Sequence, residues 1–165
     1  MKKKTLLFSL LAMLALICAG SWYYIHQNLA QAVKVEARKT YIQSSSPTIF
    51  FHGWGSSSRA ERHMANAAKK AGVTQTIIEA KVAEDGTVTL KGTIPKDAVN
   101  PIVLVNFDNN RGASTQDQGN YAYAVVKALQ DTYGIKEMNM VAHSYGNVTI
   151  VYYMLQHGSD TSLHK

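Results

Sequence analysis

The sequence predicts an α/β fold, with a mostly parallel sheet and helices on both of its faces, behind an N-terminal apolar helix. Two observations lead to this prediction. From Pro47 onward, short β-prone apolar runs alternate with segments whose apolar residues recur at helical spacing. The run over residues 101–105 is almost wholly apolar, which is typical of a parallel strand buried on both faces.

The chain begins with the pattern of a membrane-targeting segment. Lys2, Lys3 and Lys4 precede an uncharged and mainly apolar stretch over residues 5–25. About 20 apolar residues span a bilayer, whereas the apolar part of a cleaved signal is about 7 to 15 residues long. The length therefore favours an uncleaved signal anchor, with membrane contact through residues 5–25.

A cleaved signal peptide is the alternative, because small residues at positions 18–21 could admit signal peptidase and release a secreted protein. A lipoprotein is disfavoured, since Ile17 stands where a small residue is expected before Cys18. In either case the basic flank stays in the cytoplasm and the rest of the chain is extracytoplasmic. We therefore expect an anchor or signal over 1–25, a polar stalk over 26–46 and a domain over 47–165.

Charge and cysteine content exclude two classes of protein. The net charge is +6, and half of it comes from Lys2, Lys3 and Lys4. The other basic residues are scattered among acidic ones, so no basic face for nucleic acid is expected. Cys18 is the single cysteine, which excludes a disulfide scaffold.

The first predicted strand covers residues 48–51, and a helix follows it and ends at Gly72. Ser58 and Glu61 have the spacing of a capping box at the start of this helix. Its apolar face is predicted to contain Met64, Ala67, Ala68 and Ala71. Residues 76–82 and 87–91 then predict a hairpin that turns at Asp85-Gly86.

A polar loop over residues 106–118 follows the buried strand at 101–105. The next helix ends at Gly134, and its predicted core residues are Ala122, Val125, Val126, Leu129 and Tyr133. A last strand over 138–142 leads into a last helix, whose predicted core residues are Val148, Val151, Tyr152 and Leu155. Such alternation indicates a parallel sheet covered by helices.

Candidate chemistry lies between that last strand and that last helix. A serine at a sharp strand-to-helix turn exposes its hydroxyl, and this turn needs small residues two before and two after the serine. Ala142 and Gly146 meet that requirement around Ser144. His143 precedes the serine, and the amide of Tyr145 would face a developing oxyanion. The pentapeptide alone is equally compatible with an ordinary helix cap.

The segment His52-Gly53-Trp54-Gly55 follows the first predicted strand. A serine hydrolase places its second oxyanion donor in such a loop. Gly53 and Gly55 would let the backbone approach a substrate, and the amide of Trp54 would be the donor. Two motifs in this order favour a nucleophilic Ser144 over a helix cap.

These residues, together with Pro47-Thr48-Ile49-Phe50-Phe51, the Asp85-Gly86 turn, Asn100-Pro101-Ile102-Val103, Tyr133-Gly134-Ile135 and Met138-Asn139-Met140-Val141, resemble the α/β-hydrolase superfamily. The similarity is greater to uncharacterised membrane-anchored cell-surface hydrolases of Gram-positive bacteria. The resemblance implies a serine hydrolase with Ser144 as nucleophile and the amides of Trp54 and Tyr145 as oxyanion donors. Ala142 and Asn147 depart from glycines that are common in this superfamily.

The length is a larger departure, since the acid and the histidine of the triad follow the nucleophile in this fold. Only 21 residues follow Ser144, and they contain His157, His164 and Asp160. His157 lies about three helical turns beyond the serine, too far to act as its base. We therefore expect the amino-terminal half of an α/β-hydrolase fold, truncated after this turn and lacking its acid and base.

The remaining histidines have structural interpretations. His52 is expected to order the loop that follows it, and the side chain of His143 is expected to point away from Ser144. No histidine pair has metal-ligand spacing with a supporting Cys or carboxylate, so neither a metal nor another cofactor is expected.

Two functions stay open at this point. The first is an extracytoplasmic serine hydrolase acting on a small-molecule ester or acyl substrate. The aromatic residues Trp54 and Tyr145 weakly favour short acyl esters. The second is a catalytically inactive, membrane-tethered remnant or binding module.

Overall fold

Residues 12–25 and 41–163 are described by the computed structural model, in which the chain forms two compact units, Met1–Lys39 and Thr40–Lys165. In the first unit, residues 12–25 form a helix. No helix within the described ranges is both long and apolar enough to cross a membrane. The basic start at residues 1–11 and the stalk residues 26–40 lie outside the described residues.

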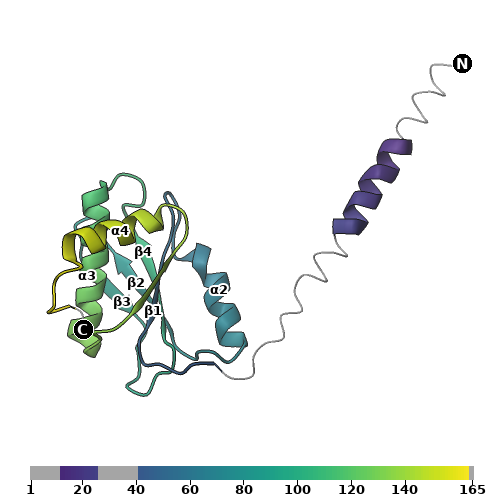
Figure 1. The fold of residues 1–165 in the computed structure, drawn as a ribbon. Helices are drawn as coiled ribbons and strands as arrows, with labels where there is room; N and C mark the ends of the chain where they lie inside the picture. The colour runs from purple at the N-terminus through teal and green to yellow at the C-terminus, as the bar shows by residue number, and fades with distance from the viewer. Residues whose placement is uncertain (1–11, 26–40, 164–165) are drawn as a thin grey trace, which may run out of the picture. The chain divides into compact units, whose positions relative to one another are not determined.

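The second unit has the predicted order of strands and helices (Figure 1). Its elements are β1 (Thr48–Phe51), α2 (Arg59–Lys70), β2 (Ile77–Val82), β3 (Val88–Lys91), β4 (Ile102–Phe107), α3 (Thr115–Tyr133), β5 (Asn139–Ala142) and α4 (Gly146–His157). The five strands form one sheet in the order β3-β2-β4-β1-β5. Only the β2–β3 hairpin is antiparallel, so the sheet is mixed and mostly parallel.

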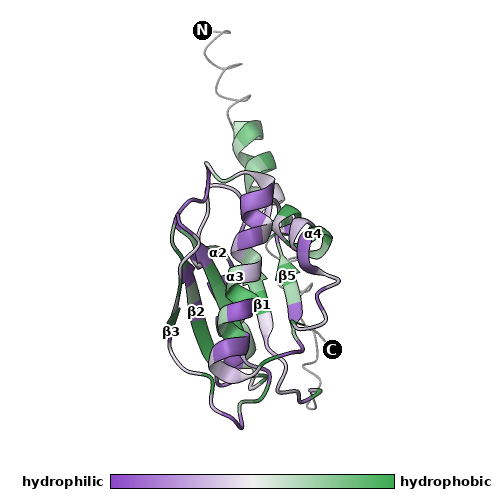
Figure 2. Ribbon diagram, turned by 90° about the vertical axis from the view of Figure 1, so that its left-hand side faces the viewer, coloured by the Kyte–Doolittle hydropathy of each residue, from purple (hydrophilic) through white to green (hydrophobic). Residues whose placement is uncertain are grey.

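Helices cover both faces of this sheet, as predicted. In Figure 2, α3 and α4 lie in front of the strands and α2 lies behind them. Alternate residues of β4 point to the two sides: Ile102 and Leu104 pack near Ala65 of α2, whereas Val103 and Val105 belong to the larger core with α3. Since β4 is central and nearly every residue in it is buried, its continuous apolar run reflects burial on both faces.

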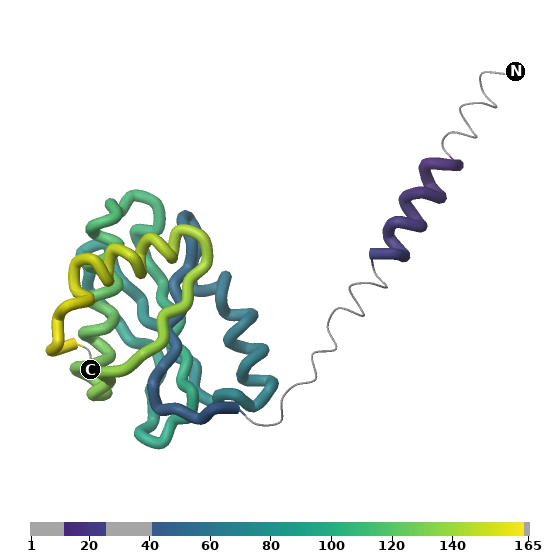
Figure 3. The backbone as a smooth tube through the Cα atoms, viewed as in Figure 1, coloured from purple at the N-terminus to yellow at the C-terminus, as the bar shows by residue number. Residues whose placement is uncertain are grey.

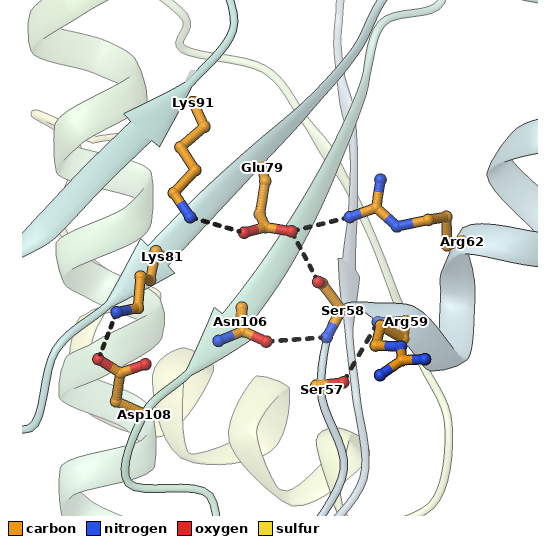
Figure 4. Close-up of polar contacts among 9 residues, drawn as sticks. All are labelled: Ser57, Ser58, Arg59, Arg62, Glu79, Lys81, Lys91, Asn106 and Asp108. Atoms are coloured by element: carbon orange, nitrogen blue, oxygen red, sulfur yellow. Dashed lines mark hydrogen bonds and ion pairs between the residues drawn. The ribbon is translucent and has the colours of Figure 1, made fainter.

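The predicted capping box at the start of α2 is wrong. Ser58 adopts helical backbone angles and makes no side-chain cap, because its hydroxyl donates to Glu79 of β2 at 2.8 Å and its amide donates to Asn106 of β4 at 3.1 Å (Figure 4). Arg62 and Lys91 also pair with Glu79, at 2.8 and 3.5 Å. These contacts attach the first turn of α2 to β2 and β4, and the side chain of Glu61 is buried instead of capping the helix.

The buried faces of α2 and α4 also differ from the predicted ones. In α2 the buried residues are Glu61 and Ala65, and Met64 is 48% exposed. In α4 the buried residues are Gly146, Thr149 and Tyr153. Two residues predicted for its core, Val151 and Leu155, are 53% and 75% exposed. Helical spacing predicted both helices correctly, but it did not predict which side of each helix packs against the protein core.

Several element boundaries differ from the sequence prediction, and two of these differences bear on the packing. Strand β4 extends to Phe107, two residues beyond the predicted apolar run, because Phe107 continues the pairing with β2. Ser44, predicted to lie in the stalk, accepts a hydrogen bond from the backbone amide of Asn100 at 2.7 Å, and its own amide donates to the side-chain oxygen of Asn100 at 2.9 Å. The side-chain amide of Asn100 also donates to the carbonyl of Ile42. Residues from about Ile42 therefore pack as part of the second unit.

Leu104→Ala is expected to lower the free energy of unfolding by about 2–5 kcal/mol, because Leu104 is fully buried in the central strand. Leu155→Ala is the matched control, and the exposed position of Leu155 predicts a change within about 0.5 kcal/mol. Urea unfolding followed by circular dichroism measures both. Equal losses in the two variants would contradict this packing.

Candidate active site

The two sequence motifs meet at the carboxyl-terminal edge of the sheet. Strands β1 and β5 are parallel neighbours that pair from Thr48 with Asn139 to Phe51 with Ala142. Parallel strands end at the same edge, so the loop after β1 and the turn after β5 lie side by side (Figure 3). We call the turn Ala142–Gly146 the elbow, and Gly53–Gly55 the glycine loop.

Ser144 occupies a strained backbone conformation in the elbow. Its φ is +55°, and only one other described non-glycine residue, Asn100, has a positive φ. This left-handed conformation reverses the chain between the end of β5 and the start of α4 within three residues. Such strain in a non-glycine residue is concentrated at functional sites.

Close backbone packing fixes the elbow onto the end of β1. A β-carbon at Gly146 would overlap the carbonyl oxygen of Phe51 and lie 2.9 Å from that of His52. Only glycine therefore fits at this position without displacing backbone. The small residue that the sequence motif requires two positions after Ser144 has a direct steric cause.

The glycine loop lies against the elbow. A β-carbon at Gly53 would lie 3.1 Å from the Cβ of Ser144 and 3.4 Å from its hydroxyl. Within the described residues, the amides of Trp54 and Tyr145 donate no hydrogen bond to another backbone or side-chain group. These amides directly follow Gly53, which packs on Ser144, and Ser144 itself, and two unbonded amides in such positions can donate to an oxyanion.

His52 orders the glycine loop from beneath. The amide of Phe107 donates to its Nε2 at 3.2 Å, so Nδ1 carries the proton and donates to the carbonyl of Gly53 at 2.8 Å. Burial lowers the pKa of His52 below its ordinary 6.5, although the hydrogen bond to Gly53 and, to a smaller extent, the Glu61 carboxylate oppose that shift. Both ring nitrogens are occupied, so His52 is a neutral structural residue here rather than a base.

His143 points toward α2 and contacts a buried carboxylate. Its Nδ1 lies 3.1 Å from Oε1 of Glu61, whose side chain is only 2% exposed. The second oxygen of Glu61 has no hydrogen-bond partner in the structure. The pair connects His143 to the first turn of α2. Its carboxylate belongs to Glu61, the residue that the sequence predicts to take part in a helix cap.

Other candidate residues are not brought to the elbow. His157, at the far end of α4, contacts Asn120 at 3.2 Å and stacks on Tyr123. His164 lies outside the described residues. No described histidine forms a hydrogen bond with the Ser144 hydroxyl. A pocket lined by Ser46 and Ile135 opens at the opposite end of the sheet and includes no elbow residue.

Metal-binding clusters are absent from the described part of the chain, in which no three His, Cys, Asp or Glu side chains converge on one point. Sequence reasoning missed two residues beside the site. Glu61 was assigned to a cap because its spacing from Ser58 fitted one, and Arg111 gave no signal within a polar loop. Both approach the site from other elements, so only the tertiary contacts identify them.

The fold and elbow define an α/β hydrolase. The chain belongs to the family of alpha/beta hydrolases of unknown function (DUF915), whose model matches residues 36–165. The predicted membership of the α/β-hydrolase superfamily is thereby confirmed. No curated protein matches the chain.

Two solved structures have the same fold. The product of the gene lin2722 from Listeria innocua is 24% identical, with a TM-score of 0.68 over 74% of this chain and 48% of that one. The "putative cell surface hydrolase from Lactobacillus plantarum WCFS1" is 21% identical, with a TM-score of 0.63 over 72% of this chain and 49% of that one. This chain therefore spans about half the length of each.

Replacement of Ser144 by glycine is expected to leave the protein more stable than replacement by alanine, by about 1–2 kcal/mol, because only alanine retains the left-handed strain. The same two replacements at the exposed Ser45 are the control. Its φ is not positive, so alanine should equal or exceed glycine there. Urea unfolding measures all four variants, and the same order at both positions would contradict the strain.

His52 predicts a pH dependence of stability. Because its pKa is lowered in the folded protein, the unfolded chain binds more protons near pH 6 and the free energy of unfolding should fall as the pH drops below about 6.5. His52→Gln should make this dependence shallower between about pH 7 and pH 5. His63→Gln, at an exposed residue of α2, should leave it unchanged. Unfolding measured across this range would contradict the assignment if the two variants behaved alike.

Proposed function

We propose that this protein is a serine hydrolase of carboxylic esters in which Ser144 is the nucleophile. The observation that carries the proposal is the strained φ of Ser144 at an elbow packed against the glycine loop. A helix cap needs neither feature. Family membership supports hydrolysis as the reaction class.

The reaction begins with attack of the Ser144 oxygen on the ester carbonyl carbon. The carbonyl oxygen becomes an oxyanion, and the amides of Trp54 and Tyr145 donate to it. The bond to the alcohol then breaks, and the alcohol leaves with the proton that a general base removed from the serine hydroxyl. In the second half of the reaction, water attacks the carbonyl carbon of the acyl-enzyme and loses a proton to the base. The bond to the Ser144 oxygen then breaks, the serine regains the proton, and the carboxylic acid is released.

None of the described histidines is positioned to act as the general base for Ser144. His52 has both nitrogens occupied, His143 faces Glu61, and His157 contacts α3. Without a base among the described histidines, oxyanion donors and substrate binding retain a part of the rate enhancement of a serine hydrolase. We therefore expect slow modification of Ser144 by reactive acyl or phosphonyl compounds.

We further propose an extracytoplasmic location, with residues 5–25 as a membrane anchor. The basic residues Lys2, Lys3 and Lys4 before an apolar stretch support this orientation. The description of the Lactobacillus plantarum structure as a cell surface hydrolase agrees with it.

A fluorescent fluorophosphonate tests the nucleophile on the full chain. Labelling should be slow and should require Ser144 and the native fold, because the oxyanion donors stand beside this serine only in the folded chain. Ser144→Ala and heat denaturation should each abolish the signal. Ser45→Ala, at an exposed serine far along the chain from the elbow, is the matched control and should label like the native protein.

Two outcomes would overturn the proposal. The first is a folded native chain that remains unlabelled, which would favour an inactive remnant or binding module. The second is equal labelling of the native chain and Ser144→Ala, which would place the reactive group elsewhere. Circular dichroism of each variant confirms that the compared chains are folded.

A further inference from the structure

Arg111 lies beside the glycine loop, although it comes from the connection between β4 and α3. Its guanidinium carbon is 5.4 Å from the centre of the Trp54 ring. A β-carbon at Gly55 would lie 3.0 Å from Nε of Arg111, whereas one at Gly53 would touch Ser144. One glycine of the loop thus faces the serine and the other faces the arginine.

Three hydrogen bonds hold the two loops together and fix the position of this cation. The amide of Gly55 donates to the carbonyl of Asn110 at 2.8 Å, and the Asn110 side chain donates to Ser56 at 2.6 Å. The indole of Trp54 donates to the carbonyl of Arg111 at 3.2 Å. The backbone of Arg111 is therefore held in place, and the contact of its guanidinium with Trp54 restrains the side chain, so less side-chain entropy is lost when a ligand binds.

The guanidinium forms no ion pair in the described part of the chain, and the residue is exposed. The acidic residues that flank Arg111 in the sequence, and Glu61 of α2, have other partners. Asp108 pairs with Lys81 at 2.9 Å, Asp117 caps α3 through Ser114, and buried Glu61 faces His143 at 3.1 Å. A planar guanidinium with free donors matches the oxygens of a carboxylate or phosphate.

We propose that Arg111 binds an anionic group, a carboxylate or a phosphate, carried by the ester substrate of Ser144. This inference rests on the proposed function, because it places the charged part of the substrate across the glycine loop from the scissile ester. The contact with the Trp54 ring keeps the guanidinium beside the loop, and its N–H donors remain available to a ligand.

Trp54 provides a reporter that does not depend on the reactivity of Ser144. The chain has two tryptophans, so Trp22→Phe leaves Trp54 as the only one. Fluorescence of this variant of the full chain is titrated, at constant ionic strength, with methyl hydrogen adipate, with inorganic phosphate and with neutral dimethyl adipate. At least one of the two anions should change the emission saturably, whereas the neutral diester should not.

Arg111→Gln in the same background should weaken binding of the anion about tenfold, the loss expected for one charge-assisted hydrogen bond. Arg59→Gln is the matched control, because Arg59 is another exposed arginine without an ion pair in the described residues. The anion that binds identifies the group as carboxylate or phosphate. No response to either anion, or equal weakening in both arginine variants, would overturn the inference.

A second measurement links this site to Ser144. The mono-4-nitrophenyl ester of adipic acid and 4-nitrophenyl hexanoate differ by one terminal carboxylate, and the native chain should be acylated faster by the charged ester. Arg111→Gln should remove this preference without abolishing acylation by the neutral ester. Equal rates for both esters in the native chain would overturn the inference alone, whereas no acylation of Ser144 by either ester would overturn the proposed function.

Discussion

The approach of the elbow to the end of β1 is the constraint on which the site depends. The backbone at Gly146 passes so close to the carbonyls of Phe51 and His52 that no side chain fits between them. This contact requires β5 to lie beside β1 in parallel, and it forces the chain to reverse at Ser144 with a positive φ. The glycine loop and the serine are adjacent because the two strands are adjacent.

Two buried polar side chains, His52 and Glu61, hold the elbow and the glycine loop in position. His52 bridges the glycine loop to β4 through both ring nitrogens, and Glu61 reaches His143 from α2. Burying a carboxylate is costly unless it is paired, so the contact with His143 links the stability of α2 to the shape of the elbow. The side chain of His143 is thus held by Glu61 of α2, whereas the backbone of His143 and of Gly146 lies against the end of β1.

The outer side of the elbow is less covered. Strand β5 has one neighbour, β1, in the described sheet, and α4 exposes Val151, Met154 and Leu155. Figure 2 shows hydrophobic residues along these two elements at the edge of the sheet. The elbow is therefore packed closely against β1 on one side. On the other side, β5 is an edge strand of the described sheet and α4 exposes apolar side chains.

The sequence alone determined the order of elements, the mostly parallel sheet and the strand–turn–helix around Ser144, because these depend on local patterns of apolar residues and glycines. It could also identify β4 as central, since burial on both faces requires an unbroken apolar run.

Tertiary structure decided the rest. Glu61 fitted a capping box by spacing, yet Ser58 bonds to Glu79 and Asn106 instead, so Glu61 was free to face His143. Leu155 fits the helical spacing of apolar residues but lies on the exposed side of α4. Periodicity predicts that a helix has an apolar side, whereas packing decides which side is buried. Arg111 meets Trp54 only because two loops distant in sequence end at one edge of the sheet, and no local pattern encodes such a meeting.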